Sequence, residues 1–163
     1  MQRRMMIAHA AVLGAAAALS LSACGGTEPL PADQAVAYYD DAATALTVAL
    51  GAGGITWEHG EASRKADERD GTCEYTPGNW SPSAPLPAPE DDAAWEARID
   101  AANPALEEHG FDAVNGTTAD GSRKVLETED AHGATLQLTA EGDLRIWGAE
   151  VTADPCELEE LSE

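Results

Sequence analysis

Apolar residues recur with a helical period in two stretches of the chain. The first stretch begins at Asp33, a suitable N-cap, and the glycine-rich segment 51–54 follows it. Its apolar positions fall on one side of a helix and are Val36, Tyr39, Ala43, Leu46 and Leu50. We therefore predict a helix over residues 33–50 that buries this stripe against the rest of the fold.

A second helical pattern begins near Asp91 or Asp92 and ends at Gly110. Its apolar stripe consists of Trp95, Ile99, Ala102 and Leu106. Pro104 lies inside this pattern, and because proline cannot donate a backbone hydrogen bond, we expect the helix to kink or restart there.

Shorter segments alternate between apolar and polar residues, which is typical of strands with one buried face. The expected strands are Ile55–Trp57, Thr72–Tyr75, Arg123–Glu129, Ala134–Ala140 and Asp143–Glu150. In chain order the elements are a helix, two strands, a second helix and three strands. This order predicts an α+β fold in which two helices pack on one face of a mostly antiparallel sheet.

A proline-rich segment separates the early strands from the second helix. Five prolines lie between Pro77 and Pro89, and we expect an extended surface loop that connects the two elements. Trp80 lies in this segment, where burial is least assured among the four tryptophans, although we favour a core role for all four. Trp147 alternates with Leu144 and Ile146, which predicts that it faces away from the main core.

The N-terminus has the pattern of an export signal. Arg3 and Arg4 precede an apolar run, rich in alanine, over residues 7–21. This run is too short and too rich in alanine for a transmembrane helix, which needs about 20 strongly apolar residues. The arginines also resemble the start of a twin-arginine signal, although we favour an ordinary positively charged leader.

The apolar run ends in Leu21-Ser22-Ala23-Cys24, which resembles the lipobox of bacterial lipoproteins. The resemblance covers residues 1 to about 26 and implies cleavage before Cys24 and a diacylglyceryl group on its sulfur. Two acyl chains anchor a protein stably, whereas one holds it only marginally. The alternative is a leader whose cysteine is incidental.

The lipobox divides the chain into three parts. Residues 1–23 are the expected signal peptide, residues 24–31 a lipidated cysteine with a short tether, and residues 32–163 a single α+β domain. The tether spans at most about 25 Å, so the domain is expected close to the extracytoplasmic face of the cell membrane.

The mature chain is strongly acidic. Removal of the signal leaves seven basic residues against 30 acidic ones, a formal charge of −23. Phosphate groups repel such a surface, so DNA, RNA and anionic headgroups are poor partners.

With Cys24 assigned to the lipid, the two remaining cysteines are Cys73 and Cys156. An oxidising compartment allows them a single pairing, and neither has a cysteine or histidine at metal-ligand spacing. We predict a Cys73–Cys156 disulfide and expect no metal or cofactor; two free thiols are the alternative.

No catalytic motif stands out in the sequence. His59 is the only histidine beside both an aromatic residue and a carboxylate, although we favour an ordinary surface histidine. We expect a non-enzymatic, lipid-anchored protein that binds a protein or a small ligand near the membrane, with Trp80, Trp147 and His59 as candidate contacts. A small cell-envelope hydrolase and an acidic cation-binding module are the alternatives.

Overall fold

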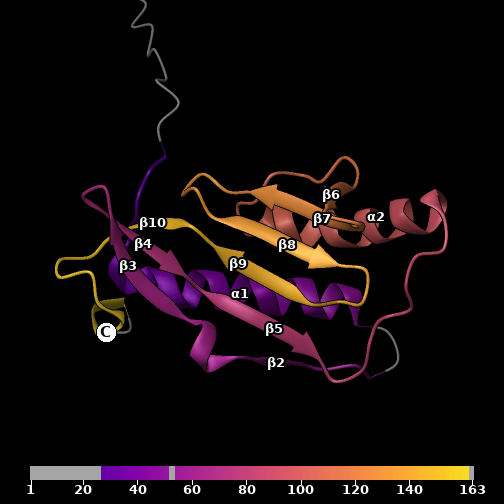
Figure 1. Cartoon of the computed structure of the whole chain (residues 1–163), viewed down its shortest axis with the longest axis horizontal. Helices are drawn as coiled ribbons and strands as arrows, with labels where there is room; N and C mark the ends of the chain where they lie inside the picture. Colours follow the sequence, from indigo (N-terminus) through magenta and orange to yellow (C-terminus); the bar gives the residue numbers. More distant parts are fainter. Residues whose placement is uncertain (1–26, 52–53, 162–163) are drawn as a thin grey trace, which may run out of the picture.

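The computed structural model describes residues 27–51 and 54–161, so the leader and Cys24 lie outside the described residues. The elements are β1 (Leu30–Pro31), α1 (Ala32–Leu50), β2 (Trp57–His59), η1 (Glu61–Ser63), β3 (Lys65–Arg69), β4 (Thr72–Thr76), β5 (Gly78–Pro82), α2 (Asp92–Glu108), β6 (Thr118–Asp120), β7 (Arg123–Glu129), β8 (Thr135–Thr139), β9 (Leu144–Trp147), β10 (Ala149–Thr152) and η2 (Leu158–Leu161). Both helices lie on the same side of the strands (Figure 1), which confirms the predicted α+β fold.

The strands form two sheets that share a bend. One sheet has the order β1-β10-β4-β3 and the other β2-β5-β9-β8-β7-β6, and only the β1–β10 pair is parallel. Pro77 alone separates β4 from β5, and Gly148 alone separates β9 from β10. Gly78 of β5 pairs with Ile146 of β9 right next to these two breaks. The neighbouring segments β4–β5 and β9–β10 therefore pass from one sheet to the other at the same position along the strands.

Helix α1 buries most of the predicted stripe. Tyr39, Ala43 and Leu46 are fully buried, while Val36 and Leu50 are partly buried against the core. The predicted N-cap is wrong, because the helix begins one residue before Asp33 and Pro31 occupies the capping position without a side-chain hydrogen bond.

Helix α2 begins where the sequence indicated. Asp91 is its N-cap and accepts a hydrogen bond from the Ala94 amide at 2.8 Å. All four residues of the predicted stripe are buried. The expected restart at Pro104 is wrong, because the helix runs on to Glu108. The side chain of Asn103, one residue earlier, exchanges two hydrogen bonds with the backbone of Val114 and fixes this part of the helix to the chain that follows.

The Cys73–Cys156 disulfide is confirmed. It joins β4 to the segment that follows β10, so it ties the C-terminal part of the chain to the sheet. The segment then forms η2, whose Leu161 is buried in the core with α1.

The tether expected at residues 24–31 is wrong for residues 27–31, because they belong to the folded body. Leu30 is buried in the core and pairs with Val151 of β10. The Glu28 amide donates to the Ala131 carbonyl at 3.1 Å, and the Glu28 carbonyl lies 2.6 Å from Nδ1 of His132. Burial of one leucine and these hydrogen bonds fix a segment that has no recognisable period.

The proline-rich segment is also only partly a loop. Its first residues form β5, and Trp80 is 7% exposed and packed in the core, so the core role that we favoured is correct for this residue. The remaining loop is held down, since Leu86 is buried and Arg98 donates to the carbonyls of Pro87 and Ala140 at 2.6 Å each.

Candidate functional site

A row of polar side chains crosses the sheet on the face opposite the helices, which we call the outer face. Asn79 of β5 pairs with Arg145 of β9, and Arg145 pairs with Gln137 of β8. Gln137 in turn pairs with Glu127 of β7. Residues that are directly opposite in antiparallel strands share a face, so an amide, a guanidinium, a second amide and a carboxylate lie side by side.

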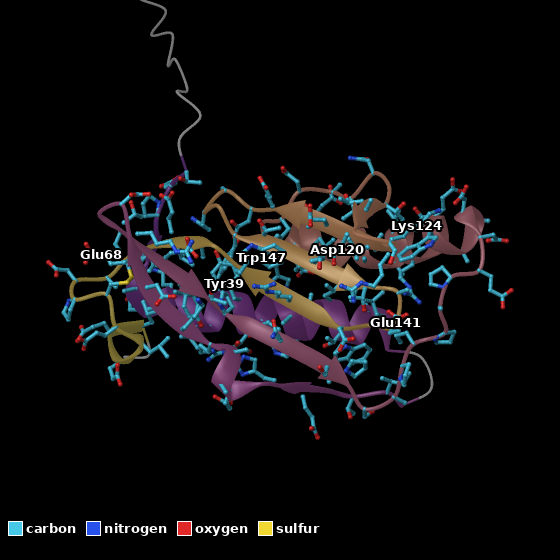
Figure 2. The ribbon with its side chains drawn as sticks, viewed as in Figure 1. Tyr39, Glu68, Asp120, Lys124, Glu141 and Trp147 are labelled. Atoms are coloured by element: carbon cyan, nitrogen blue, oxygen red, sulfur yellow. A yellow bond between two sulfur atoms is a disulfide. The ribbon has the colours of Figure 1, made fainter. Side chains whose placement is uncertain are left out.

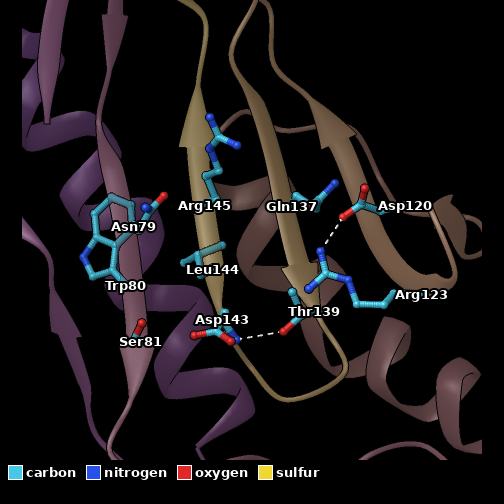
Figure 3. A pocket seen from close by; sticks show the side chains of 10 residues that line it. All are labelled: Asn79, Trp80, Ser81, Asp120, Arg123, Gln137, Thr139, Asp143, Leu144 and Arg145. Carbon is cyan, nitrogen blue, oxygen red and sulfur yellow. Dashed lines mark hydrogen bonds and ion pairs between the residues drawn. The ribbon is translucent and has the colours of Figure 1, made fainter. Parts of the chain in front are cut away.

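This row borders a shallow groove of about 310 Å³ (Figure 3). The polar side chains that line it come from β5, β8, β9 and the adjoining turn, and are Asn79, Ser81, Gln137, Thr139, Asp143 and Arg145. Asp120 and Arg123 close one side, and their side chains form an ion pair at 2.9 Å. The volume lies at the small end of the range for ligand sites.

Arg145 is the unusual residue of the groove. Its guanidinium carbon lies 4.6 Å from the centroid of the Trp147 ring, which is a cation–π contact. Trp147 is half-buried on the outer face, as the alternation in the sequence predicted. In Figure 2, Trp147 and Asp120 lie over the strands, with both helices behind.

The other basic side chains in the described part of the chain all have an oxygen partner. Five of them form ion pairs with carboxylates, and the pairs are Arg64–Asp40, Lys65–Asp67, Arg69–Glu74, Arg123–Asp120 and Lys124–Asp92. The sixth, Arg98, donates to the two backbone carbonyls described above. Within residues 27–51 and 54–161, only Arg145 has neither a carboxylate nor a carbonyl partner, although the chain carries 30 acidic residues.

Some groove side chains already form hydrogen bonds within the protein, while others have none and could bind a ligand. The Gln137 amide donates to Glu127 at 3.0 Å, and the Thr139 hydroxyl accepts from the Asp143 amide at 3.1 Å. In the described residues, the side chains of Asn79, Ser81 and Asp143 have no hydrogen-bond partner. The groove therefore combines fixed walls with free donors and acceptors.

The structure does not bring the three candidate contacts from the sequence together. His59 pairs with Trp80 across β2 and β5, and their rings are in contact at a tilt of 39°, with centroids 4.7 Å apart. Trp80 belongs to the core on the helix side of the sheet, whereas Trp147 lies on the outer face. Sequence reasoning missed Arg145, although the alternation that placed Trp147 also places Arg145 on the same face.

The surroundings of His59 stabilise the bend in the sheet. Its Nε2 lies 3.0 Å from the Pro77 carbonyl, and Glu61, its acidic neighbour at 3.5 Å, is 88% exposed. The nearby Ser63 hydroxyl donates to the Gly60 carbonyl and accepts from the backbone N–H of Asn79. With Nε2 donating to a carbonyl and the serine proton already donated, this pair is not arranged as a nucleophile and its base.

A second titratable group lies beneath the N-terminal segment. The Asp130 carboxylate accepts hydrogen bonds from the Tyr39 hydroxyl and from the amides of His132 and Ala134, all at 2.9 Å. Burial raises the pKa of Asp130 above its ordinary value, although these hydrogen bonds oppose the shift. Burial and the neighbouring Asp130 also raise the pKa of Tyr39. This network joins α1 to the turn that holds Glu28, which is a structural role.

No known protein family matches the chain, and neither a curated protein nor a solved structure shows significant similarity to it. Within the described ranges, no helix is long and apolar enough to cross a membrane. In the same part of the chain, no three His, Cys, Asp or Glu side chains are grouped so that they could hold a metal ion.

Proposed function

We propose that the protein is a lipid-anchored, extracytoplasmic binding protein that takes up a small ligand in the groove beside Arg145. The lipobox at residues 21–24 supports the anchor and the location. The groove supports the binding role, because it offers unpartnered polar groups on a rigid sheet.

The observation that carries the binding role is the state of Arg145. An exposed arginine in a chain of this charge readily finds a carboxylate, and the other arginines do so or bind carbonyls. Arg145 lies over Trp147 instead, with amide side chains from both neighbouring strands beside it. An oriented guanidinium with free donors suits recognition of a ligand oxygen.

The sequence left open whether the partner is a protein or a small molecule. The groove favours a small molecule, because it is concave and its volume of about 310 Å³ suits a compound of monosaccharide size. The outer face around it is polar, whereas the centre of a stable protein interface is apolar and depleted of charge.

The test compares the wild-type protein, extracted from its own membranes in detergent, with an Arg145→Gln variant prepared in the same way. Native mass spectrometry before and after heat release should find a small molecule on the wild-type protein that the variant lacks. Arg69→Gln removes the same charge from the other sheet and should retain it. Equal occupancy in all three proteins, or no bound molecule and no heat of binding with a low-molecular-weight envelope extract, would contradict the proposal.

A further inference from the structure

The groove has opposite electrical character at its two ends. Arg145 lies in β9 and Asp143 immediately precedes this strand, so the two residues are two apart, a spacing that in extended chain puts side chains on one face with Cα atoms about 7 Å apart. Both side chains line the groove and are exposed. A ligand that fills the groove therefore meets a cation at one end and a carboxylate at the other.

The cationic end is built for a planar anion. The guanidinium carbon of Arg145 lies over the Trp147 ring, and the N–H groups have no hydrogen-bond partner among the described residues, so they are free to bind a ligand. Asn79 and Gln137 lie directly opposite Arg145 on the two neighbouring strands and add amide groups on either side. Arginine binds a carboxylate through two parallel hydrogen bonds, which gives both strength and orientation.

The other end suits hydroxyl groups. The Asp143 carboxylate accepts hydrogen bonds only, and Ser81 can both donate and accept. A second anionic group here would be repelled by Asp143, whereas a hydroxyl would donate to it. Asp120 does not offer a further anionic contact, because Arg123 already neutralises it.

We propose that the ligand is a sugar acid, a hydroxylated compound with one carboxylate. The carboxylate binds Arg145 between Asn79 and Gln137, and the hydroxyls bind Asp143 and Ser81. This inference rests on the proposed binding function and specifies the ligand class of the same groove. The same chemistry occurs in a free sugar acid and in an acidic unit of a polysaccharide.

Calorimetric titration of the detergent-extracted protein tests each half of the ligand. The probes are glucuronate, glucose, acetate and an oligosaccharide that contains glucuronate. We expect glucuronate to bind at least tenfold more tightly than either glucose or acetate, because each of these lacks one set of contacts. If the oligosaccharide binds more tightly than the monomer, the source is a polysaccharide, and the reverse order indicates the free acid.

Three variants place the binding in the groove. Arg145→Gln should weaken glucuronate binding about 10- to 100-fold, since it removes hydrogen bonds to a charged group. Asp143→Asn should reduce the preference for glucuronate over acetate while the preference for glucuronate over glucose remains. Arg69→Gln, an equal change of charge on the other sheet, should have no effect.

Some outcomes would overturn the inference. Equal binding of glucose and glucuronate would remove the role of the carboxylate, and equal binding of acetate would remove the role of the hydroxyls. Glucuronate binding that is unchanged by Arg145→Gln would place the ligand elsewhere. If no probe binds while the native protein still carries an Arg145-dependent molecule, the ligand class is wrong and the proposed function stands.

Discussion

Trp80 and Trp147 show how one residue type takes opposite roles on two neighbouring strands. Trp80 on β5 pairs with Leu144 of β9 and enters the core together with it. Trp147 lies three residues after Leu144 on the same strand and therefore faces the other way. The first residue fills the core, whereas the second orients Arg145 on the open face.

Substitution by alanine should separate these roles. Trp80→Ala should lower the free energy of unfolding by about 3–5 kcal/mol, because it leaves a cavity among well-packed residues. Trp147→Ala should cost about 1 kcal/mol or less, because its ring is half-buried outside the main core. Urea unfolding followed by circular dichroism measures both values. A loss of similar size for both substitutions would show that Trp147 is also a core residue.

Asp130 should make stability depend on pH. Because its folded-state pKa is raised, the folded protein holds more protons than the unfolded chain between the ordinary aspartate pKa of about 3.9 and the raised value. The Asp130 contribution to stability therefore falls as the pH rises through that window, and it is constant above it.

An Asp130→Asn variant tests this pH dependence. The amide is nearly the same size and its oxygen can still accept from the backbone amides of His132 and Ala134. The stability of the variant relative to the wild type should rise as the pH increases through the window, as measured by urea unfolding at several pH values. A difference that stays constant with pH would show that Asp130 does not titrate differently in the two states.

At the scale of the elements, the sequence predicted both helices and the antiparallel meander because their apolar periods are long and regular. It missed β3, because Lys65–Arg69 is a charged edge strand without an apolar face. It missed β5, because glycine and proline at its two ends hide a strand that only tertiary pairing reveals. Strand β1 has two residues, too few to show any period.

The groove could not be predicted from the sequence, for a related reason. Alternation indicates which side chains share a face within one strand, but it does not give the order or register of the strands. Asn79 and Gln137 come to lie beside Arg145 only because β5 and β8 are the neighbours of β9. The lack of an ion-pair partner for Arg145 among the described residues is likewise a property of the assembled sheet.

The bend between β4 and β5 depends on one glycine. Gly78 has a φ of +121°, and a Cβ placed there would lie 2.5 Å from Oγ of Ser63 and 2.8 Å from Nε2 of His59. Gly78→Ala should therefore destabilise the protein by more than 2 kcal/mol, through both backbone strain and steric clash.

Gly71 provides the matched control. It also has a positive φ, +81°, but a Cβ there would meet no atom within 4 Å. Gly71→Ala thus reports backbone strain alone and should cost about 1 kcal/mol in the same unfolding measurement. Equal losses for the two variants would show that the space around Gly78 does not matter.

At the scale of the whole molecule, the proposed anchor can be tested directly. Cys24→Ala should leave the protein unprocessed or release it from the membrane, because the lipobox then lacks the cysteine that carries the lipid. Cell fractionation with intact-mass measurement gives the result, and Cys73→Ala, which removes a cysteine from the disulfide, should still sediment with membranes. A Cys24→Ala protein of mature size in the membrane fraction would contradict lipidation at this residue.

The hydrogen bonds of Glu28 and the burial of Leu30 change what a lipid on Cys24 would do mechanically. Three residue steps separate Cys24 from Thr27, which spans at most about 11 Å, compared with a headgroup layer of about 5–7 Å. Under the proposed lipidation, the turn of Ala131 and His132 is held next to the headgroups, because it binds Glu28. A lipid at Cys24 would then keep this turn within about 11 Å of the headgroups, so the folded domain could not move away from the bilayer surface as it could on a long flexible linker.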